Sequence, residues 1–227
     1  MMDNFKILSS STIKIIAITA MLIDHTGAVF DLHIGFRVVG RLAFPLFVYL
    51  IAEGFRHTKS MEKYLLRLGI FALISEIPFD LAFNNNIDFL NNTNIFYTLW
   101  LGAACAYIFR QIQHIPFFWV MITFPVVAAM TAAGWLGSDY RWFGVLFVFF
   151  AIVVAENKFL LFGVITLFML QLYFPSGTML VAALMAVPIA ALANGKRGWP
   201  AKWLFYWFYP VHLLILAGIR QMFLIFS

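Results

Sequence analysis

Charged residues are scarce in this chain, which has only 15 Lys and Arg and 10 Asp and Glu among its 227 residues. Hydrophobic residues make up 63% of the sequence and aromatic residues 19%, and the mean hydropathy is +0.92. So little polar surface cannot cover a water-soluble protein of this size. The composition therefore excludes a soluble enzyme and predicts an integral membrane protein that contacts the lipid bilayer.

Cysteine and long polar segments are lacking as well. Cys105 is the single cysteine, which excludes an intrachain disulfide and a cysteine-based metal site. No histidine or carboxylate spacing argues for zinc, so we expect no metal. The net charge of +5 is typical of a membrane protein with basic cytoplasmic loops, and we expect no nucleic acid partner. Since no hydrophilic domain interrupts the chain, residues 1–227 form one predicted transmembrane domain.

Apolar runs bounded by turn residues predict an all-α, polytopic transmembrane bundle of about nine spans. The expected spans are 12–32, 38–55, 63–83, 95–112, 116–136, 142–156, 158–174, 176–194 and 203–226. The runs at 142–156 and 158–174 are short, which leaves open whether they cross fully. With a cytoplasmic N-terminus, all basic residues face the cytoplasm except Arg37, Arg41, Arg141 and Arg220. This asymmetry follows the positive-inside rule and makes the Asn-rich stretch 84–94 an external loop.

An ionisable pair, Asp24-His25, interrupts the first apolar run near its middle. The helical rise places the pair roughly 16 Å into a ~30 Å hydrocarbon core, where ionisable groups are costly and mark functional sites. His212 in the last span lies at a similar depth, ~14 Å by the same rise. Neighbouring side chains on a helix point about 100° apart, so Asp24 cannot orient His25 directly. We expect Asp24 to face Arg41 or another neighbour, and His25 to face a cavity as a general base.

Other polar residues fall near the same predicted level or at the ends of spans. Glu76 and Asp80 share one helix face beside Pro78. Tyr97, Asp139-Tyr140 and Tyr209 add further polar groups. These residues fit three classes of function. The protein is an enzyme, a proton-coupled transporter with a midplane proton relay, or a non-enzymatic assembly factor.

A spaced series of motifs resembles the TraX family, whose namesake is the F-pilin acetylase of conjugative plasmids. The series consists of Asp24-His25-x-Gly27, Arg37-x-x-Gly40-Arg41-Leu42-Ala43-Phe44-Pro45, Glu53-Gly54-Phe55-x-His57-Thr58, Ile77-Pro78-Phe79-Asp80 and Tyr209-Pro210-x-His212. The resemblance extends over nearly the whole chain. Two positions depart from the family pattern: Thr26 stands where an apolar residue is expected, and Arg141 where glycine is expected.

The resemblance implies an acetyl-CoA-dependent acyltransferase in the bacterial inner membrane. Its acceptor would be an amine, such as a pilin N-terminus, or a hydroxyl of a glycan. By this likeness His25 is catalytic, with Asp24 and His212 around it. The residues expected to meet the phosphates of CoA are Arg56, His57, Lys59, Lys63 and Arg67. Those expected at the acceptor are Arg41, Asp80, Tyr97, Asp139, Tyr140 and Tyr209. The sequence leaves open which of His25 and His212 is the base and whether the protein forms a homo-oligomer.

Overall fold

The computed structural model describes residues 6–84, 87–88, 93–200 and 202–226. These residues form helices and turns, with one isolated backbone bridge between Leu8 and Ala193. The helices are α1 (Ser10–Val29), α2 (Gly35–Gly40), α3 (Ala43–His57), α4 (Met61–Phe83), α5 (Ile95–Ile112), α6 (Phe118–Trp135), α7 (Arg141–Val153), α8 (Lys158–Tyr173), α9 (Gly177–Leu184), α10 (Ala186–Ala191) and α11 (Lys202–Phe226). The prediction of an all-α fold is confirmed for this part of the chain.

Two of the predicted spans are broken, and proline accounts for both breaks. The run 38–55 corresponds to α2 and α3, which separate at Arg41 and Leu42. Pro45 has no N–H to bond the Arg41 carbonyl, and its ring crowds that carbonyl. Pro188 has the same relation to Leu184, the last residue of α9. Counting each broken run once, the described helices match the predicted runs to within a few residues.

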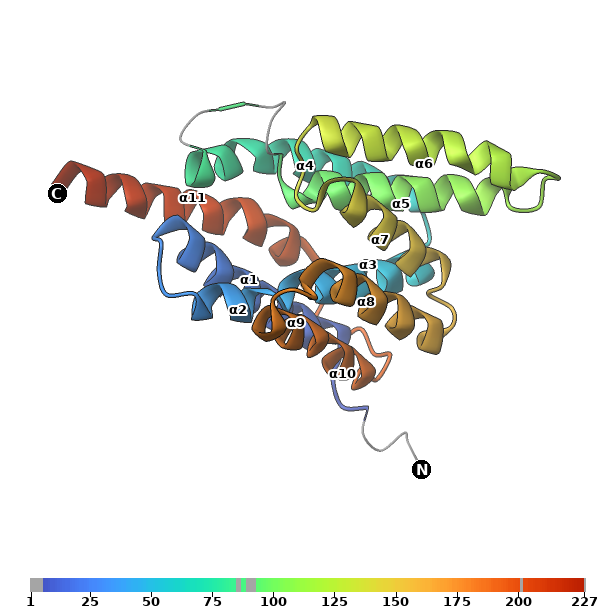
Figure 1. Ribbon diagram of the computed structural model, residues 1–227, viewed down its shortest axis with the longest axis horizontal. Coiled ribbons are helices and arrows are strands. Elements are labelled where there is room, and N and C mark those ends of the chain that lie inside the picture. The colour runs from blue at the N-terminus through green and yellow to red at the C-terminus, as the bar shows by residue number, and fades with distance from the viewer. Residues whose placement is uncertain (1–5, 85–86, 89–92, 201, 227) are drawn as a thin grey trace.

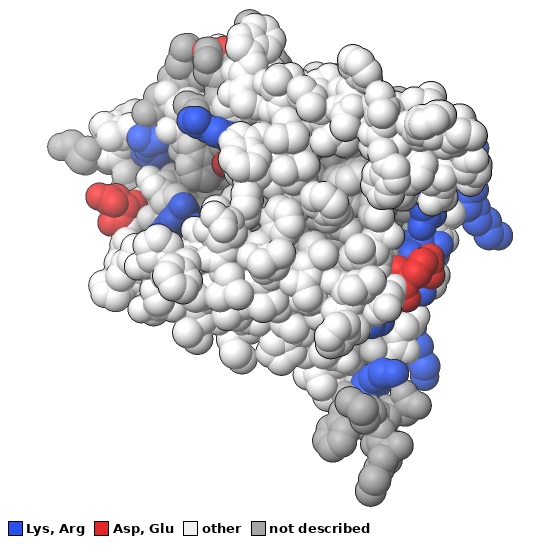
Figure 2. All heavy atoms as spheres, turned by 45° about the vertical axis from the view of Figure 1, so that its right-hand side comes forward, with Lys and Arg blue, Asp and Glu red and all other residues white. Residues whose placement is uncertain are grey.

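Apolar surface covers much of the molecule, as a membrane protein requires. Five helical segments are long and apolar enough to cross a bilayer, namely Ser10–Val29, Gly35–His57, Ile95–Ile112, Phe118–Trp135 and Lys202–Ile225. Large apolar side chains such as Phe124 and Phe159 point outward. Figure 2 shows a wide belt almost without charge between two charged margins. These features support a membrane protein, whereas nine complete crossings and a cytoplasmic N-terminus stay predictions.

Successive helical segments alternate in direction when α2 with α3 and α9 with α10 are each counted as one, and they give the bundle two ends (Figure 1). We call the end where α1 and α4 finish and α5 and α7 begin the histidine end. The opposite end, where α3, α5 and α7 finish, is the glutamate end. Helix α7 packs between α3 and α5, while α11 packs on α1 and α4. Gly102 allows the close approach of α5 to α7, since a Cβ there would lie 2.6 Å from the Cβ of Val148. The predicted loop 84–94 lies in large part outside the described residues.

Candidate active site at the histidine end

Helices α1 and α11 bring the two predicted midplane histidines into direct contact. His25 Nδ1 and His212 Nε2 lie 2.8 Å apart, and His212 Nδ1 lies 2.7 Å from the Phe208 carbonyl oxygen. A carbonyl only accepts, so His212 Nδ1 carries a proton, and in a neutral pair its Nε2 accepts from His25 Nδ1–H. The free lone pair is then on His25 Nε2, which has no hydrogen-bond partner in the described part of the chain. The hydrogen bond of the histidine pair therefore has a direction, from His25 to His212, and the nitrogen that can accept a proton is Nε2 of His25.

Asp24 turns to α2 and pairs with two arginines, one of which was not predicted. Arg41 Nη2 lies 2.7 Å from Asp24 Oδ1, as expected, and Arg37 Nη1 lies 2.9 Å from Oδ2. Arg41 also donates to the hydroxyl of Tyr173, at 3.2 Å. Sequence reasoning placed Arg37 on the outer surface. Its spacing of four residues from Arg41, which puts both on one helix face, is the signal that could have identified it.

The close approach of Asp24 to α2 depends on Gly40. A Cβ added at Gly40 would lie 2.0 Å from Asp24 Oδ1 and 2.3 Å from Asp24 Cγ. Because no real side chain tolerates such contacts, only glycine at this position leaves room for the carboxylate. Side chains of Asp24 and Arg41 are each only 13% exposed, so this ion pair is largely shielded from water.

A cavity of about 350 Å³ lies beside the ion pairs and the histidine pair. Its walls come from α1, α2, α3, α4, α11 and the N-termini of α5 and α7, and they include many apolar groups such as Phe44, Phe79 and Phe83. The predicted site residues that line it are Asp24, His25, Arg41, Asp139, Tyr140 and Tyr209. The hydroxyl of Tyr209 is buried, and no described acceptor takes its proton. Its donor is therefore unused beside the cavity that Tyr209 lines.

The loop between α6 and α7 carries Asp139 and Tyr140 into this wall. The Asp139 N–H donates to the Thr93 carbonyl at 3.2 Å, and the Thr98 hydroxyl donates to the Asp139 carbonyl. Tyr140 and Arg141 adopt left-handed backbone conformations, with φ of 61° and 46°. Such values favour glycine, the residue that the resemblance led us to expect at position 141. This chain instead holds Arg141 in a strained turn.

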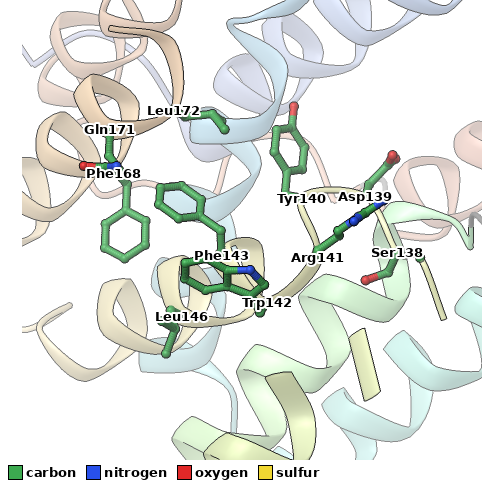
Figure 3. Close-up of a pocket in the computed structure, with 11 residues that line it drawn as sticks. Ser138, Asp139, Tyr140, Arg141, Trp142, Phe143, Leu146, Phe168, Gln171 and Leu172 are labelled. Atoms are coloured by element: carbon green, nitrogen blue, oxygen red, sulfur yellow. The ribbon is translucent and has the colours of Figure 1, made fainter. Parts of the chain in front are cut away.

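Asp139 lies where two cavities meet. It lines the histidine cavity and also a second, more open space of about 650 Å³ bounded by α7 and α8 (Figure 3). Burial raises the pKa of the Asp139 carboxyl to about 6, with a further rise from Asp24 and an opposing effect of Arg37 and Arg41. At neutral pH most of this carboxyl is still ionised. Its oxygens have no hydrogen-bond or ion-pair partner within the described ranges.

Some predicted site residues lie elsewhere. The Asp80 carboxylate accepts hydrogen bonds at 2.7 Å from the Asn84 amide and from the Asp88 backbone, so it holds the start of the 84–94 loop. Neither Asp80 nor Tyr97 lines the histidine cavity. Glu76, which sequence reasoning noted without assigning to the site, is fully buried and accepts from the backbone and side chain of Asn94, the residue that caps α5. Glu76 thereby positions the chain segment to which the Asp139 loop is bonded.

The five cations predicted to meet CoA lie toward the glutamate end and do not form one cluster. Arg56 pairs with Glu53 at 2.9 Å and with Glu156 at 3.4 Å, and Glu53 also pairs with Lys158. His57 Nε2 lies 3.8 Å from Glu53, while Arg67 lies over the ring of Tyr64. Lys59 and Lys63 are exposed and make no ion pair with a described carboxylate. Only part of the predicted cationic surface is therefore free to bind an anion.

Comparison with known proteins agrees with the resemblance drawn from the motifs. The model of the family described as TraX protein matches residues 9–220. The chain belongs to the TraX family. It is also 30% identical to a protein of Dichelobacter nodosus named "Probable fimbrial assembly protein FimC, serogroup H1", and the alignment covers 94% of this chain and 96% of that protein. No solved structure matches the chain.

Proposed function

We propose that this TraX-family membrane protein transfers an acetyl group from acetyl-CoA to a primary amine, with His25 as the general base. The observation that carries the proposal is the directed histidine pair, whose basic end lines a cavity. A hydrogen-bonded partner that fixes the tautomer of a catalytic histidine is a recurring device of acyl transfer. The fimbrial assembly relative supports a pilin-like acceptor, in the bacterial inner membrane, over a glycan.

The proposed step balances without any further reagent. The acceptor nitrogen attacks the thioester carbonyl carbon as His25 Nε2 removes its proton, and the carbon–sulfur bond then breaks. The leaving thiolate of CoA takes up the proton. Negative charge develops on the carbonyl oxygen, and the free Tyr209 hydroxyl is the donor that we assign to it. His212 stabilises the protonated His25, and Asp24 acts only through the two arginines.

On the donor side, we propose that the nucleotide of acetyl-CoA stays at the glutamate end, on the cytoplasmic side. Lys59 and Lys63 are its first contacts there because no carboxylate of the described residues neutralises them. Arg56 and His57 already have Glu53 as a partner, and Arg67 packs on an aromatic ring, so their share of phosphate binding is smaller. The pantetheine arm would have to reach about half of a ~30 Å hydrocarbon core to bring the thioester to His25.

A transfer assay in proteoliposomes tests the proposal. We expect radiolabelled acetyl-CoA, added on one side only, to label a short peptide with a free N-terminal amine, and an N-formylated copy of the peptide to stay unlabelled. A proton-coupled transporter would use the same buried Asp and His residues. It would instead give pH-driven proton flux without acetyl-CoA and no labelled peptide, and that result would overturn the proposal.

A further inference from the structure

Several cations gather around the first turns of α11 at the glutamate end, where α11 lies beside α1 and α4 (Figure 1). Lys14 on α1 lies over the ring of Phe205, with its Nζ 5.2 Å from the ring centroid. Arg67 on α4 interacts with the side chain of Tyr206. Lys202 is the first residue of α11. Because residues three and four positions apart share a helix face, Lys202 lies on the same face of α11 as these two rings.

A fourth cation, Arg197, comes from the segment between α10 and α11, which is fastened to the start of α1. The Ser11 N–H donates to the Arg197 carbonyl at 3.1 Å. A Cβ at Gly198 would lie 2.1 Å from Ser11 Oγ, so only glycine lets the segment approach α1 so closely. The segment thereby holds Arg197 near enough to Lys14 for the two charges to repel each other. We call the following residues the α11 cation group: Lys14, Arg67, Arg197 and Lys202.

No described carboxylate forms an ion pair with the α11 cation group. By contrast, Arg110 at the same end pairs with Glu156 at 3.9 Å. Basic side chains at a membrane surface need no such partner where they extend into water. Lys14 and Arg67 are partly buried, however, and Arg67 Nε is buried without an acceptor among the described residues. An anion from outside the chain would therefore stabilise this group.

The surface beside the α11 cation group is apolar. On α4, Leu66, Ile70 and Leu73 are exposed, and their spacing of four and three residues places them on one helix face. On α11, Trp203 and Trp207 are 55% and 47% exposed. Exposed tryptophans close to cations are typical of the headgroup level of a bilayer. The cations therefore lie where polar headgroups meet acyl chains.

This combination of charge and apolar surface fits an anionic phospholipid. A phosphate group accepts hydrogen bonds from ammonium and guanidinium groups and neutralises their charge. The acyl chains of the same lipid would cover the exposed apolar faces of α4 and α11. The phosphates of a nucleotide carry the same charge. A nucleotide also has a base and a ribose, whose polar groups would be left without partners on an apolar surface.

We infer that the α11 cation group binds the phosphate of an anionic phospholipid whose acyl chains lie along α4 and α11. Basic residues between transmembrane helices are a recurring site for such headgroups. The inference does not depend on acetyl transfer. It assigns a lipid phosphate to Arg67, a residue that the sequence predicted to meet the phosphates of CoA.

Lipid binding to the purified full-length protein in detergent tests the inference. Native mass spectrometry measures the binding of phosphatidylglycerol, of phosphatidylcholine and, in a separate titration, of CoA. Arg67→Gln and Lys202→Gln each remove one charge from the α11 cation group. Arg110→Gln is the matched control, because it removes a charge at the same end from a residue that pairs with Glu156 and lies over the ring of Phe55.

We expect the wild-type protein to bind phosphatidylglycerol about tenfold more tightly than phosphatidylcholine, and either variant to weaken phosphatidylglycerol binding about threefold to fivefold. Arg110→Gln should change it by less than about twofold. No preference for phosphatidylglycerol, or an equal loss in Arg110→Gln, would overturn the site. Loss of CoA affinity with phosphatidylglycerol binding unchanged would show that the phosphate belongs to a nucleotide, and would overturn the lipid. Lys202 stands at the start of its helix, so Lys202→Gln is expected to keep the fold even if Arg67→Gln does not.

Tryptophan fluorescence locates the lipid by a separate measurement. Bromine atoms on acyl chains quench the tryptophans that they contact, and we expect brominated phosphatidylglycerol to quench more than brominated phosphatidylcholine. The excess should disappear in the double variant Trp203→Phe, Trp207→Phe. It should persist in Trp119→Phe, the control, because Trp119 is exposed at the same end on α6. Excess quenching that survives in the double variant would overturn the inference.

Discussion

Two carboxylates in this protein, Asp24 and Glu53, each hold two cations, and the results differ because of where they lie. Asp24 joins Arg37 and Arg41 at the histidine end, and both Asp24 and Arg41 are 13% exposed. Glu53 joins Arg56 and Lys158 at the glutamate end. Glu53 is as buried as Asp24, at 12% exposed, but Lys158 is 42% exposed and the neighbouring Glu156 72%. The first set of ion pairs borders a cavity, whereas the second connects helix ends beside water.

The comparison shows that charge pairing alone does not mark a site. Burial of both partners makes the Asp24–Arg41 pair costly to keep. A cavity with a basic histidine lies beside this pair, which supports a functional role for it. At the glutamate end the same residue types connect α3 to the turn between α7 and α8 and to the first residue of α8. Glu53 and Glu156 also neutralise Arg56, a cation that the sequence predicted to bind the phosphates of CoA.

The largest difference is expected when each carboxylate loses its charge. Asp24→Asn leaves Arg41 buried without its partner and should lower the free energy of unfolding by about 3 kcal/mol. Glu53→Gln leaves cations that can reach water, so the loss should be about 1 kcal/mol or less. Urea unfolding in detergent micelles, followed by circular dichroism, compares the two. Equal losses would show that the cations at the two ends do not differ in exposure as described.

A glycine substitution sharpens the same contrast without removing any charge. Gly40→Ala pushes a Cβ into the Asp24 carboxylate and should cost about 2 kcal/mol through displacement of that side chain. Gly163→Ala on α8 meets no atom within 4 Å and serves as the control. It should be neutral or stabilise by up to about 1 kcal/mol, since alanine favours the helix. If thermal unfolding shows the two variants to be alike, the tight fit of Asp24 against α2 is wrong.

The smallest effect concerns the free cations at the glutamate end. The double variant Lys59→Gln, Lys63→Gln should weaken acetyl-CoA binding about fivefold at low salt, with little change at high salt, because exposed charge contacts are weak and screened. Arg56→Gln should weaken it less, since Glu53 and Glu156 already compensate Arg56. Calorimetric titration at two salt concentrations measures both. Unchanged affinity in the double variant would remove the donor from this surface and favour the transporter.

Much of the fold could be predicted from the sequence, because the apolar runs and the turn residues between them indicate directly where each helix begins and ends. The helix Ile95–Ile112 begins and ends as predicted, and the other runs differ by a few residues. The breaks near Arg41 and Met185 were not predicted, although Pro45 and Pro188 were visible. A proline in a membrane helix can also be absorbed without a break, as Pro78, Pro125 and Pro210 show here.

For the candidate site, the sequence predicted the depth of the polar side chains in the membrane. It did not predict which side chains contact one another. Helical rise placed His25 and His212 at one level, and their contact agrees with that. The helical rise does not indicate which helix faces contact each other. For this reason Arg37 was assigned to the outer surface and Asp80 to the acceptor site. The interlocking of Glu76, Asn94 and Asp139 comes from three separate segments and has no local sequence signal.

The most direct test of the central claim is acetyl transfer in a single turnover by His25→Ala and His212→Ala, each saturated with acetyl-CoA. We expect His25→Ala to slow transfer by about 10³-fold, as loss of a general base does, with acetyl-CoA affinity unchanged. His212→Ala should slow it by about tenfold to a hundredfold, because His25 keeps its lone pair but loses the partner that fixes its tautomer. Near wild-type transfer by His25→Ala, or a larger loss in His212→Ala, would contradict His25 as the base.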